Sequence, residues 1–367
     1  MNGIYLTIFF ISLLLFLLGS GVWVALSMVA VSAIGMMLFT SRPVGDAMAT
    51  TIWGTSSSWS LTALPLFVWM GEILFRTKLS ENLFKGLSPW LSRLPGGLIH
   101  VNVVGCALFA AISGSSAATV ATVGKMSIPE LRKRKYPEKL LLGSLAGSGT
   151  LGLLIPPSII LIIYGVTIED SIAKLFMAGI LPGIMIALIF MSYVVIWSIL
   201  NKKLMPKNLQ NFSFSQKIKA SKQLFPVILL ITSVIGSIYT GIATATEAAS
   251  LGVLGALVLS WFQQTLNTKT FKLSLLGATK TSCMIAFILA GSTFLSLAMG
   301  FTGLPRNLAV WINNMNLSPF MLIFILTIFY IILGMFLDGI SAVVLTMAII
   351  EPMIRQAGFD MIWFGIY

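Results

Sequence analysis

The stretch from Asn102 to Pro129 constrains the fold more than any other part of the chain. It is apolar enough for a lipid bilayer, yet its centre, residues 113–119, reads Ser-Gly-Ser-Ser-Ala-Ala-Thr. Arg93 precedes the stretch, and a basic cluster at 132–135 follows it. Because basic flanks mark the cytoplasmic side, both ends lie on the same side of the membrane. The stretch therefore predicts a re-entrant hairpin whose irregular tip is buried in protein or lines a wet cavity.

The composition of the whole chain is that of a membrane protein. Of its 367 residues 57% are hydrophobic and 9% are charged, whereas about a quarter of the residues in soluble domains are charged. The net charge of +12 comes from Lys and Arg in short loops between apolar spans. Such loops orient a membrane protein, so we expect contact with membrane lipid and no nucleic-acid partner.

Apolar runs in the first part of the chain predict its first spans. One helix over residues 4–40 would be roughly 55 Å long, against a hydrocarbon core of about 30 Å, so two spans are expected around Gly19–Gly21. They are predicted to be retained spans, because no basic region or cleavage site of a signal peptide is present. Residues 43–58 are mixed and suit the membrane interface, and a further span follows at 61–77.

The run from Leu140 to Val166 predicts a discontinuous transmembrane helix. It is interrupted by glycines at Gly147–Gly152 and by two successive prolines in Ile155–Ser158. Proline in a helix interior removes a backbone hydrogen bond and clashes with the preceding turn, so this pair should open the helix.

The chain then crosses back and begins a second half. Residues 175–200 form the next span, and a polar, lysine-rich loop up to Lys222 divides the chain on its cytoplasmic side. Further spans are expected at 224–239, 248–263 and 273–301, the last with a weak point at Gly291–Thr293.

A second hairpin is predicted at residues 319–350, around Leu337–Ser341. It resembles the first in its small polar tip and in an acidic residue beside a proline after the second arm, and the charge rule orients it the opposite way. Inverted repeats with broken helices are typical of secondary transporters. The expected fold is therefore an all-α polytopic membrane protein with inverted repeats, two re-entrant helical hairpins and discontinuous transmembrane helices.

Three passages carry a resemblance to a known family. They are Ser113–Thr119 followed by Pro129-Glu130, Gly149–Gly152 leading to Ile155–Ser158, and Gly241–Thr244 with Thr246–Ala249. In this order and spacing the chain resembles the large membrane subunit of the tripartite ATP-independent periplasmic (TRAP) transporters, over essentially its whole length. The family's second half continues into its own discontinuous helix, whereas this C-terminally truncated sequence stops at Tyr367 as that helix begins. We therefore expect either a fragment or a chain that lacks the second broken helix.

The resemblance implies a sodium-driven importer of organic anions in the bacterial inner membrane. Family members carry C4-dicarboxylates, other carboxylates and sialic acids, with a small four-helix membrane subunit and a periplasmic substrate-binding protein as partners. It also implies an elevator-type scaffold plus transport domain. The expected divisions are 1–94 (scaffold), 95–166 (first transport repeat, with hairpin 95–130 and broken helix 140–166), 167–223 (crossing span and loop), 224–301 (second-half spans) and 302–367 (second hairpin).

Interrupted helices can bind a cation and an anion at one place. Unwound backbone exposes carbonyl oxygens, which small cations such as Na⁺ accept as ligands, and half-helix N-termini present free N–H groups to a carboxylate. The predicted first sodium site comprises Ser113, Gly114 and Ser116 with Gly149, Thr150 and Gly152. The second comprises Asp338, Gly339 and Ser341. Thr119, Pro156, Pro157 and Ser158 surround the substrate carboxylate, Ser115 and Ser292 complete the binding set, and Thr244, Thr246 and Glu247 support it.

Structural explanations compete with these assignments. Small residues let membrane helices pack closely, and Asp338 and Glu247 could cap helices. Glu72 could pair with Arg76 one turn later. His100 is expected at a surface or interface, and no enzymatic role, cofactor or transition-metal site is expected, because a lone histidine leaves a serine nucleophile without a base and metal ligands are few.

Two other transport classes remain open. A stand-alone sodium–carboxylate symporter with similar hairpins would need no partner subunits, and a channel is a third class, weakened by the inverted broken helices. A self-contained ATPase is disfavoured because the sequence contains no GxxxxGK[ST] motif.

The opposed hairpins can be tested by labelling. Single cysteines at Lys207 and Asn316 should react with an impermeant maleimide from opposite sides of the membrane, because the charge rule places Lys207 in the cytoplasm and Asn316 outside. Labelling of both positions from one side would contradict the inverted arrangement.

Overall fold

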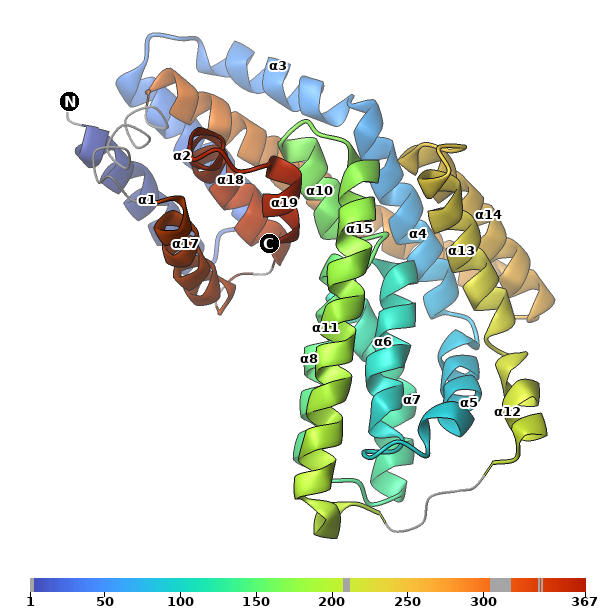
Figure 1. The fold of residues 1–367 in the computed structure, drawn as a ribbon. Coiled ribbons are helices and arrows are strands. Elements are labelled where there is room, and N and C mark those ends of the chain that lie inside the picture. The colour runs from blue at the N-terminus through green and yellow to red at the C-terminus, as the bar shows by residue number, and fades with distance from the viewer. Residues whose placement is uncertain (1–2, 207–211, 304–317, 336, 338) are drawn as a thin grey trace.

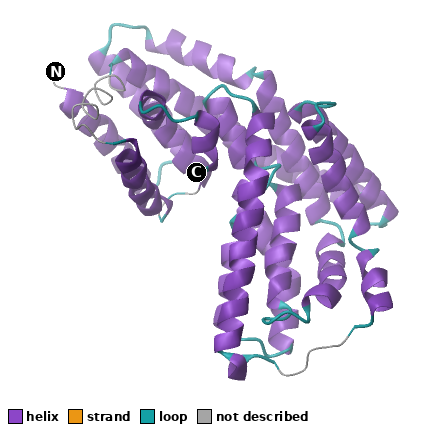
Figure 2. Cartoon of the chain, viewed as in Figure 1, coloured by secondary structure: helices purple, strands orange, loops and turns teal. Residues whose placement is uncertain are grey.

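The structure is a computed structural model, and it describes residues 3–206, 212–303, 318–335, 337 and 339–367. Within these ranges the regular structure is helical and contains no strand (Figures 1 and 2). Among the described residues, four helices are long and apolar enough to cross a membrane by length and composition, and up to seven if each bent pair counts as one span. The all-α membrane fold is confirmed.

Two helices replace the single long apolar run at the start of the chain. They are α1 (Gly3–Gly19) and α2 (Val24–Phe39), and they join at Gly21, whose φ of +83° favours glycine. The predicted interfacial segment is helix α3 (Val44–Ser56), which has no buried residue. It leads at an angle of 54° into η1 (Trp59–Thr62) and α4 (Ala63–Phe75).

The first hairpin and broken helix form one packed unit. After the short helix α5 (Leu79–Leu91) come the hairpin arms α6 (Ile99–Ser113) and α7 (Ser116–Lys133). The predicted discontinuous helix consists of α8 (Glu138–Gly149), α9 (Leu151–Leu154) and α10 (Ile159–Thr167). Helix α6 packs on both α7 and α8, so the hairpin lies along the broken helix.

The second half contains long helices and the second hairpin. The crossing helix is α11 (Ile172–Leu200), followed by η2 (Lys202–Leu204), α12 (Phe214–Ser221), α13 (Phe225–Tyr239), α14 (Ala245–Phe262) and α15 (Thr268–Phe301). The hairpin arms are α17 (Pro319–Gly334) and α18 (Gly339–Gln356), and α19 (Met361–Ile366) ends the chain. In Figure 1 the arms of the first hairpin rise to their tip, whereas those of the second descend to theirs, which agrees with the predicted inversion.

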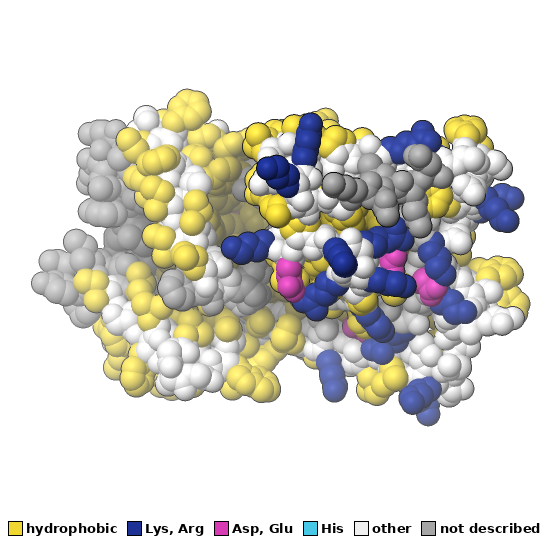
Figure 3. Space-filling model, turned by 90° about the horizontal axis from the view of Figure 1, so that it is seen from below, with side chains coloured by type: hydrophobic (Ala, Val, Ile, Leu, Met, Phe, Trp, Pro, Cys, Tyr) yellow, Lys and Arg dark blue, Asp and Glu magenta, His cyan; other side chains and the backbone are white. Residues whose placement is uncertain are grey.

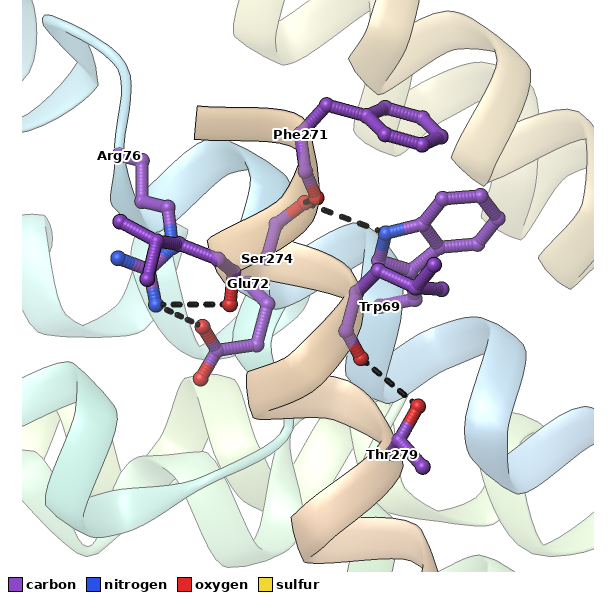
Figure 4. Close-up of polar contacts among 8 residues, drawn as sticks. Trp69, Glu72, Arg76, Phe271, Ser274 and Thr279 are labelled. Carbon is purple, nitrogen blue, oxygen red and sulfur yellow. Dashed lines mark hydrogen bonds and ion pairs between the residues drawn. The ribbon is translucent and has the colours of Figure 1, made fainter. Parts of the chain in front are cut away.

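Helix α4 joins the two halves through α14 and α15. Trp69 Nε1 donates to Ser274 Oγ at 3.3 Å, and Arg76 donates to the Glu72 carboxylate at 2.9 Å and to the Leu273 carbonyl at 3.3 Å (Figure 4). The predicted pairing of Glu72 with Arg76 is confirmed. Because Arg76 also binds the α15 backbone, the pair fixes α4 against the second half.

Helix α15 runs without interruption through Gly291–Thr293, so the prediction of a weak point there is wrong. A Cβ on Gly291 would lie 2.9 Å from the Ala25 carbonyl oxygen of α2. Glycine is therefore needed for close packing of two helices and not for a break, because small residues let membrane helices approach.

His100 is fully buried, which contradicts its expected place at a surface. The turn at Gly96 folds back over the start of α6, and the His100 Nε2 atom lies 2.8 Å from the Pro95 carbonyl oxygen. A Cβ on Gly96 would lie 3.0 Å from His100 Nε2 and 2.6 Å from Val194 Cγ1 of α11. A helix almost 100 residues later therefore closes this region, and local hydropathy could not predict the burial.

Candidate functional site

The tip of the first hairpin is built by a left-handed glycine and a serine cap. Gly114 ends α6 with φ +59°, which only glycine adopts freely. The Ser115 side chain accepts the Ala118 N–H at 3.4 Å and so caps α7. Thr119 Oγ1 donates to the Ser115 carbonyl at 2.7 Å and lies 3.0 Å from Ser113 Oγ. These hydroxyls therefore hold the tip in one conformation.

The interruption of the broken helix is buried. Four residues, Ile155–Ser158, separate α9 from α10, and Pro156, Pro157 and Ser158 are buried. Proline has no N–H to donate, so the helical ladder stops here. Ser158 Oγ donates to the Leu153 carbonyl and does not cap α10. It therefore satisfies a carbonyl group on the α9 side of the break.

The tip and the break touch through their backbones. The Ile159 N–H donates to the Gly114 carbonyl at 3.2 Å. A Cβ on Gly114 would lie 2.6 Å from the Pro157 carbonyl oxygen, and one on Gly152 would lie 3.0 Å from Ser115 C and Ser116 N. Both interruptions were predicted from the sequence. The structure places them in contact although about 40 residues of chain separate them.

The second hairpin reaches the same break from the other end. A Cβ on Gly339 would lie 2.5 Å from Ile160 Cδ1 of α10. The buried Ser292 hydroxyl donates to the Val344 carbonyl at 2.6 Å and ties α15 to α18, and Ser341 is also buried. The predicted site residue Asp338 lies outside the described residues.

The first hairpin tip, the break at Ile155–Ser158 and the start of α18 form a junction, at which helix N-termini and C-termini lie close together. Helices α7, α10 and α18 begin at Ser116, Ile159 and Gly339, while α6 and α9 end at Ser113 and Leu154. Helix N-termini carry partial positive charge and C-termini partial negative charge. The junction therefore offers N–H groups suited to an anion beside carbonyl oxygens suited to a cation.

A pocket of about 620 Å³ adjoins the junction. It lies between the broken helix, the second hairpin and α19, and Leu153, Ile160 and Gly339 line it next to the break. Tyr164 and Tyr330 contribute hydroxyls, which bind the Met361 carbonyl at 2.6 Å and the Thr346 hydroxyl at 2.7 Å. The described lining includes no charged side chain, so dipoles and hydroxyls, not an arginine, are available to a carboxylate there.

Some predicted site residues lie away from the junction or have a structural role. Thr150 is exposed and donates to the Gly147 carbonyl of its own turn at 2.7 Å. Gly149 packs beside Val120 of α7, because an added Cβ would lie 2.0 Å from its Cγ2. Thr244 and Glu247 form a capping box at the start of α14, with Thr246 between them in its first turn.

Gly71 was missed by sequence reasoning. A Cβ on this α4 residue would lie 3.0 Å from Ser113 Cα, so α4 presses directly on the hairpin tip. A single glycine within an apolar span carried no signal of that contact, whereas runs of glycine and proline marked the interruptions.

Gly152→Ala tests the contact between tip and break. The added Cβ meets backbone atoms that cannot rotate away, so we expect a loss of about 1–3 kcal/mol in stability. Thermal unfolding in detergent is the measurement, with Gly143→Ala in α8 as the control, because no atom lies within 4 Å of a Cβ there. Equal melting temperatures for the two variants would contradict the close approach.

Known proteins resemble this chain along most of its length. The family model described as "Tripartite ATP-independent periplasmic transporter, DctM component" matches residues 10–367. The C4-dicarboxylate TRAP transporter large permease protein DctM of Pseudomonas aeruginosa is 32% identical over 335 residues, covering 91% of this chain and 78% of the relative.

The names of two further relatives mention other substrates. The sialic acid TRAP transporter large permease protein SiaM of Vibrio cholerae is 30% identical, covering 95% of this chain and 81% of the relative. The isethionate TRAP transporter permease protein DctMQ of Oleidesulfovibrio alaskensis is 31% identical, covering 89% of this chain and 51% of the relative. With its opposed hairpins and broken helix, the chain belongs to the DctM family of TRAP transporter large permease proteins.

Proposed function

We propose that this chain is the membrane permease of a tripartite system that imports an organic anion across the bacterial inner membrane with Na⁺ as the coupling ion. The observation that carries the proposal is the meeting of the first hairpin tip with the interrupted helix, through the bond from Ile159 N–H to the Gly114 carbonyl. Family membership supports transport, and the junction chemistry supports an anion and a cation.

Oxygen atoms at the first tip suit a sodium ion. Helix α6 ends there with its carbonyl groups directed toward the junction, and Ser113 at its end lies beside Ser116 and Thr119 in the first turn of α7. Carbonyl and hydroxyl oxygens of unwound helices coordinate Na⁺ in secondary transporters. A cation bound between tip and break would hold the two together and so couple its own binding to the position of the hairpin.

The anion is expected beside the cation, at the N-termini of α7 and α10. The Ile159 and Ala118 N–H groups bind the Gly114 carbonyl and the Ser115 hydroxyl. The other N–H groups of these first turns have no partner within their helices and favour a carboxylate. The adjoining pocket of about 620 Å³ has room for a small organic acid, since ligand pockets span roughly 300–1,000 Å³. Relatives are named for a C4-dicarboxylate and for sialic acid, so we propose a carboxylate as the substrate class.

We propose two protein partners, a small four-helix membrane subunit and a periplasmic substrate-binding protein. The name DctMQ of one relative, of which this chain covers 51%, supports a companion membrane component. Large apolar side chains are exposed along α13 and α14, for example Phe225, Leu229 and Leu254, and lipid or another membrane helix would cover them.

Uptake into proteoliposomes tests the proposal. A C4-dicarboxylate or sialic acid should accumulate only when the large and small subunits, the binding protein and an inward sodium gradient are all present. Uptake by this chain without partners would support a stand-alone symporter instead, and flux that does not saturate with substrate would support a channel.

In the same assay Ser116→Ala and Asp338→Asn should raise the sodium concentration for half-maximal uptake by about tenfold or more, since a bond to a charged group contributes roughly 1.5–3 kcal/mol. Ser192→Ala is the matched control, because Ser192 is exposed on α11 and donates to the Leu188 carbonyl of its own helix. Unchanged sodium titrations in both test variants would remove these residues from the site.

A further inference from the structure

A second large cavity lies away from the junction, at the base of the first hairpin. Its volume is about 1050 Å³, and helices α5 and α7 and the turn after α7 form its walls. Five cationic side chains line it, together with one carboxylate: Lys85, Lys125, Lys133, Arg134 and Lys135 with Glu130. Figure 3 shows Lys and Arg side chains crowded over one part of this face of the molecule.

Three of these cations are available to an anion. Arg134 binds Glu130 at 2.7 Å, and Lys85 binds Glu81. Within the described part of the chain, Lys125, Lys133 and Lys135 pair with no carboxylate at ion-pair distance. The three lysines are exposed, and no carboxylate among the described residues neutralises them, so the cavity and its rim attract anions.

Buried hydroxyl groups in the cavity wall add hydrogen-bonding capacity. Ser92 is 3% exposed, and its Oγ has no hydrogen-bond partner among the described residues. The Tyr136 hydroxyl accepts the Leu98 N–H at 3.1 Å, which leaves its own proton to donate. Burial raises the pKa of Tyr136, so the phenol keeps that proton at neutral pH. An unpartnered buried hydroxyl normally finds a partner, and a bound oxyanion would supply one.

The surroundings of the cavity favour a lipid over a soluble anion. Phe84, Met126 and Phe212 line the cavity beside the lysines. Helix α12 packs on α5, and the two helices expose Trp90 and Phe214, of which 44% and 69% of the surface is accessible. Tryptophan is enriched at membrane interfaces, and the basic side of a membrane protein faces the leaflet that carries anionic lipid.

We infer that this cavity binds the phosphate group of an anionic phospholipid through Lys125, Lys133 and Lys135, with Ser92 and Tyr136 as hydrogen-bond donors. A headgroup there would contact both α5 and α7. It would therefore link α5, which follows the first spans, to the second arm of the first hairpin.

Native mass spectrometry of the full-length protein, with its small subunit where the two copurify, tests the inference. Phosphatidylglycerol should bind in preference to phosphatidylcholine of the same acyl chains, and sn-glycerol 3-phosphate should not compete at equal concentration. The triple variant K125Q/K133Q/K135Q should lose roughly fivefold in affinity per lysine. The control K139Q/K269Q/K272Q removes the same charge from lysines outside the cavity lining and should bind as wild type does.

Ser92→Ala separates binding from folding. Removal of an unpartnered hydroxyl should leave the melting temperature unchanged or raised, while phosphatidylglycerol affinity falls several-fold. Equal losses in the two triple variants, equal binding of the two lipids, or competition by glycerol phosphate would each overturn the lipid site.

Discussion

The backbone contact between a hairpin tip and a broken helix is the interaction on which the rest of this structure depends. Ile159 donates its N–H to the Gly114 carbonyl, and Gly152 lies against Ser115. In a bilayer each unsatisfied backbone group costs several kcal/mol, so interrupted helices persist only where protein, water or a ligand satisfies them. The hairpin tip supplies the Gly114 carbonyl as an acceptor and the broken helix supplies the Ile159 N–H as a donor, so each interruption satisfies a backbone group of the other.

This mutual dependence explains why the two hairpins and the long helices are arranged as they are. The first tip contacts the break and the start of α18 contacts α10, so three helix N-termini and two C-termini lie near one another. Helices α4 and α15 are joined through Arg76, Glu72 and the Leu273 carbonyl (Figure 4). Helix α4 packs on the first hairpin and α15 on the second, which limits where the hairpins lie. A site made of helix ends can accept opposite charges side by side without any buried charged residue.

Local chemistry made most of the fold predictable from sequence. Basic flanks identified the first hairpin, and consecutive glycines and prolines marked the break at Ile155–Ser158. Packing between distant segments was not predictable, because glycine serves both breaks and close contacts. Gly291 was interpreted as a weak point but accommodates the α2 backbone, whereas Gly71 gave no signal of its contact with the tip. Two parts of the account stay predictions. One is the division of the chain into residues 1–94 and 224–301 apart from the hairpin repeats, and the other is the assignment of residues to the ion and the anion.

Hydrogen–deuterium exchange of the purified protein, in sodium and then in potassium, tests most directly whether the junction binds the coupling ion. The account predicts that Na⁺ slows exchange of amides in 113–119 and 150–160, because a bound cation would hold tip and break together, while amides in α13 and α14 are unaffected. Equal exchange of the tip and the break in the two cations, under conditions where sodium drives uptake, would contradict the proposed site.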